Sequence, residues 1–335
     1  MDVEIVFVSK ENIAFRRKLL RWYAKQGRDL PWRRTHDPYA ILVSEIMLQQ
    51  TQVGSVLPFY ERWLKRFPNF EALAAASESD VLHAWQGLGY YSRARNLHRA
   101  AILIVRQFNG ILPRNPNEIC RLPGLGRYTS NAVATFAFNQ PVPIVEANIT
   151  RVIARLFDIR VAVDTTAGRE RLWQSAEWLL PKRNAGRYNS ALMDLGALVC
   201  VKIPRCSLCP VKSLCRASRP ERLPIKKPRR QTIQLTESHN FVRQKNKILL
   251  EQSSGRWRGM WMLPPASIVP IRERPIYSAM FPFTHHKINL QVFRAPQPYR
   301  RHSGRWIPVE QLDQTPMPSP HRRALISLLN AKSPG

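Results

Sequence analysis

Residues 122–129 are Leu-Pro-Gly-Leu-Gly-Arg-Tyr-Thr, a short turn between two stretches of helical apolar spacing. Glycines at positions 124 and 126 allow neighbouring backbone N–H groups to point outward together. Placed before a helix N-terminus, such a turn forms a nest that contacts a phosphate rather than a base. A plain tight turn between two packed helices is the alternative. We predict a helix-hairpin-helix over residues 115–138, with candidate phosphate-binding residues Leu122, Gly124, Gly126 and Arg127.

The charge of the chain indicates a polyanionic partner. The 335 residues include 52 Lys and Arg but only 23 Asp and Glu, which gives a net charge of +29. An excess of this size repels itself in a folded protein, and binding to a polyanion relieves it. From Arg219 onward there are 21 basic and 6 acidic residues, so the last third is the more basic part. Nucleic acid is the first candidate partner and an anionic membrane surface is the second.

The sequence disfavours the membrane alternative. The first ten residues carry Asp2 and Glu4 and lack the basic-then-apolar order of a signal peptide. The longest uncharged run, residues 128–145, is interrupted by Pro141 and Pro143 and predicts a buried helix followed by a turn. We expect no membrane association and a cytoplasmic, nucleoid-associated location.

Three stretches of different composition divide the chain. With 44% apolar residues, it is large enough for two domains that each have a core. Apolar spacing is helical almost throughout residues 11–201, which predicts a helical domain over residues 1–218. Residues 219–236 are rich in proline and basic residues and predict an extended linker. Beyond them the apolar period changes towards two and a last helix follows at 319–329, so residues 237–331 predict a smaller α+β domain.

Four of the five cysteines lie close together, with the spacing Cys200-x5-Cys206-x2-Cys209-x5-Cys215. Four thiolates at this density hold a tetrahedral zinc ion or a cubane iron–sulfur cluster, and they indicate a reducing compartment. Zinc ribbons usually draw their ligands from two separate x2 knuckles, whereas one compact run supplies all four here, so we favour iron–sulfur. Cys120, outside the run, is expected to be an ordinary core thiol.

Glu45 is an acidic residue in an otherwise apolar helical stretch. Ile41-Leu42-Val43 precede it and Ile46-Met47-Leu48 follow it. Burial among these side chains would raise the pKa of the Glu45 carboxyl, so that it could hold a proton near neutrality. The ordinary alternative is a glutamate on a solvated helix face.

Longer motifs accompany the hairpin and the cysteine run. They are Leu30-Pro31-Trp32-Arg33, SEIMLQQTQV at 44–53, GLGYYSRARNL at 87–97, Met193-Asp194-Leu195-Gly196 and Cys206-Ser207-Leu208-Cys209-Pro210. Together they resemble the endonuclease-III-like superfamily of DNA glycosylases and, within it, the MutY-type adenine DNA glycosylases. The resemblance is dense from about residue 15 to 218 and thin beyond. It implies a mainly α helix-hairpin-helix glycosylase fold with a 4Fe–4S cluster on Cys200, Cys206, Cys209 and Cys215.

The resemblance implies base-excision repair of double-stranded DNA by a monomeric enzyme. The expected reaction hydrolyses the N-glycosidic bond of adenine mispaired with 8-oxoguanine or guanine. It requires protonation of the leaving base and stabilisation of an oxocarbenium-like sugar. Two alternatives stay open: a mismatch glycosylase for another base, such as thymine opposite guanine, and a catalytically impaired lesion-binding protein.

By resemblance, the catalytic residues are Glu45 as general acid, Glu146, Tyr128 and Asn148. Glu146 stands where the family has an aspartate and Ala147 where it has a glycine, so we expect activity that is retained but altered. The alternative for Glu146 is a helix N-terminal residue that only complements the dipole. Tyr128 stands where strand-cleaving relatives carry a lysine, and a phenol cannot form a Schiff base, which implies a monofunctional glycosylase. Tyr128 and Asn148 would line the pocket or orient the sugar.

The target base must leave the helical stack before it can be excised. By resemblance, Gln50 and Tyr90 enter the duplex beside the flipped base, where an amide bonds base edges and a planar ring stacks. Surface exposure for Gln50 and core packing for Tyr90 are the alternatives. The expected phosphate contacts are Arg93, Arg95, Arg121 and Arg127.

The last third of the chain carries two thinner resemblances. Residues 255–264 (GRWRGMWMLP) resemble an element of the family's MutT-like, or Nudix-like, domain. Phe283-Thr284-His285 resembles the loop that contacts 8-oxoguanine opposite the adenine. No acidic pyrophosphatase box is present in the sequence, so we expect no catalysis by this domain. The alternative is a basic DNA-docking module that does not recognise the lesion.

Overall fold

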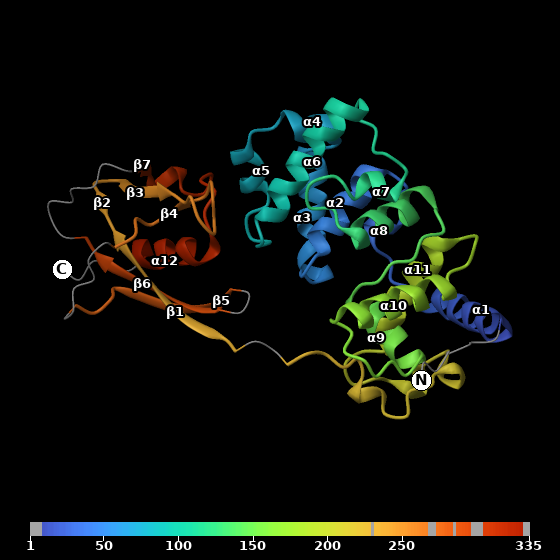
Figure 1. Cartoon of the computed structure of the whole chain (residues 1–335). Helices are drawn as coiled ribbons and strands as arrows, with labels where there is room; N and C mark the ends of the chain where they lie inside the picture. The colour runs from blue at the N-terminus through green and yellow to red at the C-terminus, as the bar shows by residue number, and fades with distance from the viewer. Residues whose placement is uncertain (1–8, 229–230, 267–272, 284–285, 296–303, 331–335) are drawn as a thin grey trace. The chain divides into compact units, whose positions relative to one another are not determined.

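A computed structural model describes residues 9–228, 231–266, 273–283, 286–295 and 304–330. Helices dominate as far as residue 222, strands begin at residue 233, and one helix closes the chain (Figure 1). The α-helices are α1 (Ser9–Gln26), α2 (Pro38–Leu48), α3 (Val53–Arg66), α4 (Phe70–Ala75), α5 (Glu78–Ala84), α6 (Ser92–Phe108), α7 (Pro116–Ile119), α8 (Arg127–Phe138), α9 (Ala147–Leu156), α10 (Thr166–Leu179), α11 (Ala185–Asp194) and α12 (Ser319–Asn330). A π-helical turn, η2 (Leu195–Val199), follows α11 directly. The strands are β1 (Ile233–Phe241), β2 (Arg243–Gln244), β3 (Lys247–Gln252), β4 (Trp261–Met262), β5 (Tyr277–Phe283), β6 (His286–Arg294) and β7 (Arg305–Pro308).

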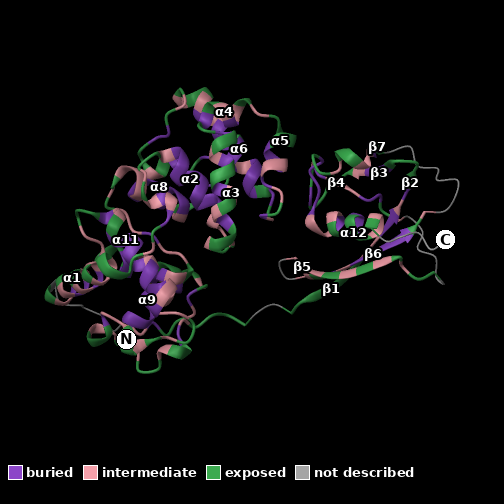
Figure 2. Cartoon of the chain, turned by 180° about the vertical axis from the view of Figure 1, so that it is seen from behind, coloured by how far each residue is buried: buried purple, intermediate pink, exposed green. Residues whose placement is uncertain are grey.

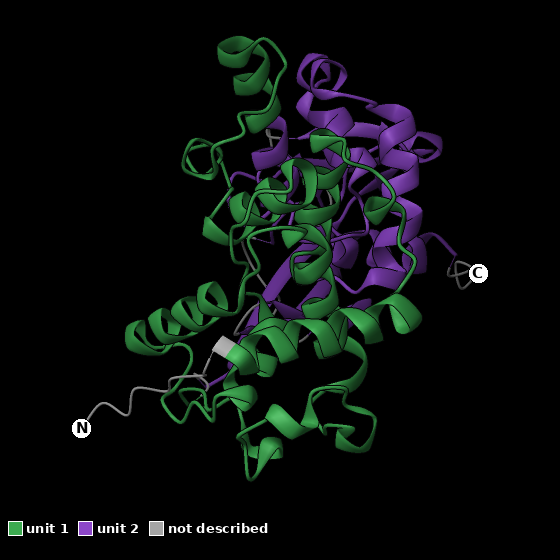
Figure 3. Ribbon diagram, turned by 90° about the vertical axis from the view of Figure 1, so that its right-hand side faces the viewer, with its two compact units in different colours: residues 1–50, 100–228 green, residues 51–99, 229–335 purple. Residues whose placement is uncertain are grey.

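The chain forms two compact units, which are coloured separately in Figure 3. Unit 1 comprises residues 1–50 and 100–228, and unit 2 comprises residues 51–99 and 229–335. The predicted domains, residues 1–218 and 237–331, stay a prediction beside this division into compact units. The core of unit 1 gathers apolar side chains from several helices, among them Leu19, Ile153, Leu172 and Leu192.

α2 is buried along almost its whole length (Figure 2). Asp37 caps it by accepting hydrogen bonds from the amides of Tyr39 at 3.0 Å and Ala40 at 3.3 Å, and Pro38 occupies the first turn. Every residue from Tyr39 to Met47 is then buried. An acidic side chain in this helix is therefore removed from water.

The segment predicted as a free linker is partly ordered against unit 1. Leu223 is buried, the amide of Val163 donates to the carbonyl of Ile225 at 2.9 Å, and the amide of Lys227 donates to the Asp164 carboxylate. At the other end, β1 already begins at Ile233. Leu223, Ile225 and Lys227 therefore have partners in unit 1, while most of the other described residues between 219 and 236 are exposed, and the linker stays a prediction.

The C-terminal part of unit 2 has the α+β character that the sequence predicts. One sheet has the strand order β1-β6-β5, with β1 parallel and β5 antiparallel to β6. In a second sheet β3 pairs antiparallel with β2, β4 and β7. Ile248, Leu290 and Leu325 belong to the buried core of this C-terminal part. The finer Nudix-like assignment stays a prediction.

Among the residues that the structure describes, no helix is both long enough and apolar enough to span a membrane.

Candidate active site

Glu45 lies inside unit 1, on the buried helix α2, and is only 4% exposed. Its Oε2 accepts a hydrogen bond of 2.8 Å from the hydroxyl of Tyr128 on α8. The pKa of the Glu45 carboxyl is raised to about 7, because loss of solvent and the charge of Glu146 outweigh the Tyr128 hydroxyl and the Arg33 charge, which lower it. The predicted burial and raised pKa are confirmed, and the carboxyl can hold a proton near neutrality.

Tyr128 supplies a hydroxyl at this site and no basic nitrogen. Burial raises the pKa of its phenol well above the usual value, and the charges of Glu45 and Glu146 add to that rise. The phenol therefore stays protonated and donates. Gln49, the residue that follows α2, also donates a hydrogen bond of 3.2 Å from its Nε2 to Thr129 Oγ1 on α8.

Glu146 caps α9. Its Oε2 accepts from the Asn148 amide at 2.7 Å and its Oε1 from the Ile149 amide at 2.8 Å. Burial raises the pKa of the Glu146 carboxyl, while the two amides and the charges of Arg151 and Arg28 oppose that rise. The helix-terminal alternative for this residue is thus present in the structure. A capping carboxylate beside Glu45 is also placed to stabilise positive charge, so capping and a catalytic role are compatible.

An ion-pair network that the sequence did not indicate stands behind Glu45. The fully buried Asp194 accepts hydrogen bonds from Arg33 Nη1 and Nη2 at 2.8 and 2.9 Å and from Arg28 Nε at 2.8 Å. The pKa of Asp194 is lowered by these partners although burial acts against them. Arg33 and Asp194 lie in the sequence motifs at residues 30–33 and 193–196. The motifs therefore contained both residues, but the sequence did not show that they are in contact.

Asn148 is held by an arginine on the same helix. Arg151 Nη2 donates to Asn148 Oδ1 at 2.8 Å and to the Gly196 carbonyl at 2.6 Å, and its Nε donates to the Cys200 carbonyl at 2.6 Å. Gly196 lies in the π-helical turn η2, where a Cβ would approach the Cβ and carbonyl oxygen of Asn148 to 2.7 Å. Only glycine fits at this contact.

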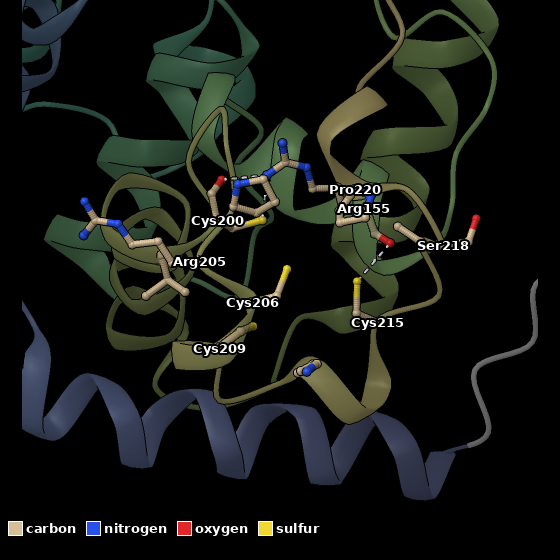
Figure 4. Close-up of a pocket in the computed structure, with 12 residues that line it drawn as sticks. Arg155, Cys200, Arg205, Cys206, Cys209, Cys215, Ser218 and Pro220 are labelled. Atoms are coloured by element: carbon tan, nitrogen blue, oxygen red, sulfur yellow. Dashed lines mark hydrogen bonds between the residues drawn. The ribbon is translucent and has the colours of Figure 1, made fainter.

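The four cysteines surround one hollow. They line a cavity of about 290 Å³ together with Arg155 and Pro220, and Figure 4 shows the cysteine side chains around this shared space. Cys200 Sγ accepts from Arg155 Nη1 at 3.2 Å, and Cys215 Sγ donates to the Arg155 carbonyl at 3.3 Å. The buried Arg155 guanidinium also donates to the carbonyls of Cys200, Val201, Lys202 and Leu223.

In the described ranges, no three His, Cys, Asp or Glu side chains converge closely enough to hold one metal ion. Burial raises the pKa of the Cys209 thiol to about 11 and that of Cys215 in the same direction. Cys120 does not lie in a core: it is exposed at the end of α7, so that prediction is wrong.

The hairpin has the expected shape. Gly124 has φ 77°, a left-handed conformation that suits glycine, and Leu122 is buried, so it contributes packing and backbone rather than an exposed side chain. Gly126 has φ −83°, which any residue can adopt, and a Cβ there would meet no atom within 4 Å. Neither backbone conformation nor internal packing requires glycine at position 126. The space that a side chain would occupy there is open.

Gln50 and Tyr90, expected at the duplex, both adopt left-handed backbone conformations, with φ 58° and 49°. They fall in different units. Tyr90 is 42% exposed, so the core alternative does not hold for it. Arg121 and Arg127 are exposed as well.

Arg93 and Arg95 are not placed as the phosphate contacts that we expected. They are only 8% and 9% exposed. Arg93 Nη2 donates to Thr51 Oγ1 and to the carbonyls of Leu88 and Gly89, and burial lowers its pKa to about 10. Arg95 pairs with Glu78 at 3.1 Å. Helical packing uses these side chains inside unit 2, which spacing in the sequence could not reveal.

In the C-terminal part, Phe283 stands in a group of rings. Trp257 lies edge-on to it at 6.2 Å, and the Arg256 guanidinium lies 4.6 Å from its ring centroid. Arg256 is paired with Glu237 at 2.6 Å. Thr284 and His285 lie outside the described residues.

The hairpin, the buried glutamate and the cysteine loop define a helix-hairpin-helix protein of base excision DNA repair. The profile of the HhH-GPD superfamily of base excision DNA repair proteins matches residues 43–177, which include Glu45, Tyr128 and Glu146. The adenine DNA glycosylase of Buchnera aphidicola subsp. Baizongia pistaciae is 38% identical over 261 residues, 76% of this chain and 74% of that protein. The chain belongs to the adenine DNA glycosylase family.

Two further comparisons cover different lengths of the chain. The adenine DNA glycosylase of Buchnera aphidicola subsp. Acyrthosiphon pisum is 29% identical over 93% of this chain and 96% of its own. A thermostable thymine-DNA glycosylase of known structure matches with a TM-score of 0.57 and 32% identity, over 62% of this chain and 96% of that one. The sequence similarity to the first of these extends into the C-terminal part, whereas the structural similarity to the second covers a smaller share of the chain.

Proposed function

We propose that this chain is a monofunctional adenine DNA glycosylase that excises adenine mispaired with 8-oxoguanine or guanine. The observation that carries the proposal is the buried Glu45 carboxyl, which has a pKa of about 7. The charge of a second carboxylate, Glu146, contributes to this raised pKa. A pair of carboxyl groups held in different environments is the usual means of breaking a glycosidic bond. The family relationship supplies adenine as the base.

The residues suit a stepwise hydrolysis. Glu45 donates its proton to the adenine ring as the bond between the base and C1′ of the sugar breaks, so the bonding electrons leave with a neutral base. The oxocarbenium-like sugar that remains is stabilised by the Glu146 carboxylate. A water then adds to C1′, and its proton passes to the Glu45 carboxylate, which restores the acid for the next turnover. Because Tyr128 offers no amine, no Schiff base forms and the strand is left intact.

The cysteine cavity is proposed to hold a 4Fe–4S cluster. Four thiols around a shared hollow suit a cubane, and the Arg155 cation offsets thiolate charge there. When bound, the group supplies four iron–thiolate bonds that cross-link residues 200–215. Zinc remains the alternative, and purified protein separates the two: a brown colour that bleaches on oxidation is expected, and colourless, zinc-loaded protein would overturn the proposal.

Recognition of the duplex is proposed to involve both units, in a monomer that acts in the cytoplasm. Gln50 and Tyr90 would enter the duplex beside the target. Phe283 begins the sequence Phe283-Thr284-His285, which would contact 8-oxoguanine opposite the adenine. The ring and guanidinium that pack on Phe283 support an ordered platform at that point.

Single-turnover excision from four duplexes tests the proposal. The duplexes carry A:8-oxoG, A:G, A:C and T:G pairs, and cleavage at the abasic product is developed with alkali. We expect the fastest release from A:8-oxoG and A:G, and no strand break before alkali. Fastest release from T:G would assign the enzyme to thymine, which the structural similarity to a thymine-DNA glycosylase makes a specific alternative. Tight binding without release from any duplex would sink the enzymatic assignment.

A further inference from the structure

Arg127 and Trp173 form a stacked pair at the surface of unit 1. The guanidinium carbon of Arg127 lies 3.9 Å above the centroid of the Trp173 ring. Arg127 is the first residue of α8 and exposed, while Trp173 lies within α10 and is half-buried. A packed helix thus presents an aromatic face to the arginine that follows the glycine turn.

The stacking leaves the hydrogen-bonding edge of Arg127 unused. Within the described ranges, Arg127 has no hydrogen bond or ion pair from its side chain, and the ring of Trp173 is its contact. A guanidinium stacked by its face keeps five N–H donors free in its plane and keeps its full charge. Arg33 contrasts with it, because its donors are engaged by Asp194.

Open space adjoins the turn directly before Arg127. Gly126 precedes Arg127 directly, and a Cβ on Gly126 would meet nothing within 4 Å. A phosphodiester can approach closely here for two reasons. The Arg127 guanidinium has no anionic partner within the described ranges, and the adjacent Gly126 backbone carries no side chain.

We propose that Trp173 is a positioning residue that holds the Arg127 guanidinium for a DNA backbone phosphate. The proposal rests on the proposed function for its DNA ligand. The indole fixes the plane of the guanidinium without neutralising it, which lowers the entropy lost when the phosphate binds. A cation–π contact at an exposed site is worth about 0.5–1 kcal/mol, which sets the upper limit of this preorganisation at about two- to fivefold in affinity.

The test is a double-mutant cycle on DNA binding. The variants are Trp173→Leu, Arg127→Met and the combination, measured against an undamaged duplex over a range of salt concentrations. Arg127→Met should weaken binding and reduce the salt slope by about 0.9, the value for one phosphate. Trp173→Leu should weaken binding by about two- to fivefold. The double variant should bind no worse than Arg127→Met, because both changes remove the same contact.

Conservative and control variants separate positioning from a fold defect. Trp173→Phe keeps an aromatic face and should restore most of the affinity lost in Trp173→Leu. Trp178 lies on the same helix α10 and is 40% exposed, so Trp178→Leu serves as the matched control and should bind as the parent does. The losses in Trp173→Leu should fall on affinity, with the single-turnover rate at saturating protein retained.

Two results would overturn the inference: parental affinity in Trp173→Leu, or fully additive losses in the double variant. Either one would show that the ring does not act through Arg127. Failure of the proposed function has a different signature. A chain that releases no base from any duplex but keeps the coupling on undamaged DNA would lose the enzymatic assignment and retain this one.

Discussion

The middle of α2 holds a buried glutamate and the start of α9 holds a half-buried one, and the two helices hold these carboxyl groups in opposite ways. Glu45 sits within α2, where the backbone amides are used by the helix itself, and its carboxyl accepts a hydrogen bond from the Tyr128 hydroxyl. Glu146 sits before α9, where two free amides point at it and both of its oxygens accept. Burial raises the pKa of both groups, but only Glu146 has backbone donors that favour the charged form.

The comparison shows that the position of a glutamate along a helix can decide whether its protonated or its charged form is favoured. A glutamate inside a helix receives little stabilisation as an anion, whereas one at a helix start receives it from the unpaired amides. The first is therefore suited to donate a proton and the second to remain charged opposite a cationic sugar. Three substitutions test this division.

Glu146→Gln should have the largest effect and abolish turnover, with a loss of about 10⁴-fold or more, comparable to other carboxylate-to-amide changes at catalytic sites. The charge that stabilises the sugar disappears, and one of the two capping contacts to the Asn148 and Ile149 amides is lost. Single-turnover excision and a binding titration measure the two consequences, and DNA affinity should persist. Glu146→Asp is the matched control, since it keeps the charge and should retain measurable turnover. Near-parental activity in Glu146→Gln would place the second carboxylate elsewhere.

Glu45→Gln should cost about 10³-fold in the single-turnover rate, because the amide cannot donate a proton of suitable acidity to the leaving base. DNA affinity should be unaffected. Glu170→Gln, at an exposed position on α10, is the control and should react as the parent does. A Glu45→Gln variant that keeps most of its rate would mean that the proton comes from another donor.

Tyr128→Phe should have the smallest effect on rate, less than about tenfold below pH 7, because it removes one hydrogen bond. Its diagnostic effect is on the pH profile. The parent needs Glu45 protonated, so its rate should fall as the pH rises above about 7, the pKa of that carboxyl. The Tyr128 hydroxyl lowers this pKa, so its removal should raise the pKa and move the fall in rate to higher pH. An unchanged profile would show that Glu45 is not the titrating acid.

The sequence predicted those parts of the site that depend on local pattern. Apolar neighbours on both sides of Glu45 predict its burial, and alternating glycines predict the turn at 122–126. The four cysteines identify their own loop by spacing. Each of these features needs only residues that lie close together along the chain.

The features that the sequence did not reveal depend on contacts between distant residues. Asp194 meets Arg28 and Arg33 across about 160 positions, and Trp173 meets Arg127 across two helices. The same limit explains why Arg93 and Arg95 were expected to contact phosphates. The sequence of a basic helix face is the same whether that face is exposed to solvent or packed against other helices. Leu223 shows it again, because a proline-rich stretch gave no sign of the surface on which it packs.

Gly196 carries a consequence for how this site can vary in evolution. Its π-helical turn packs directly against Asn148, where a Cβ at position 196 would clash. The position of the α9 start, and with it the Glu146 carboxyl, therefore depends on a residue without a side chain that lies fifty positions further along the chain. The position admits a single amino acid for steric reasons alone. Glu146 itself is free to exchange with aspartate while a helix cap and a charge persist. The most restricted position of the site is therefore a residue that takes no part in its chemistry.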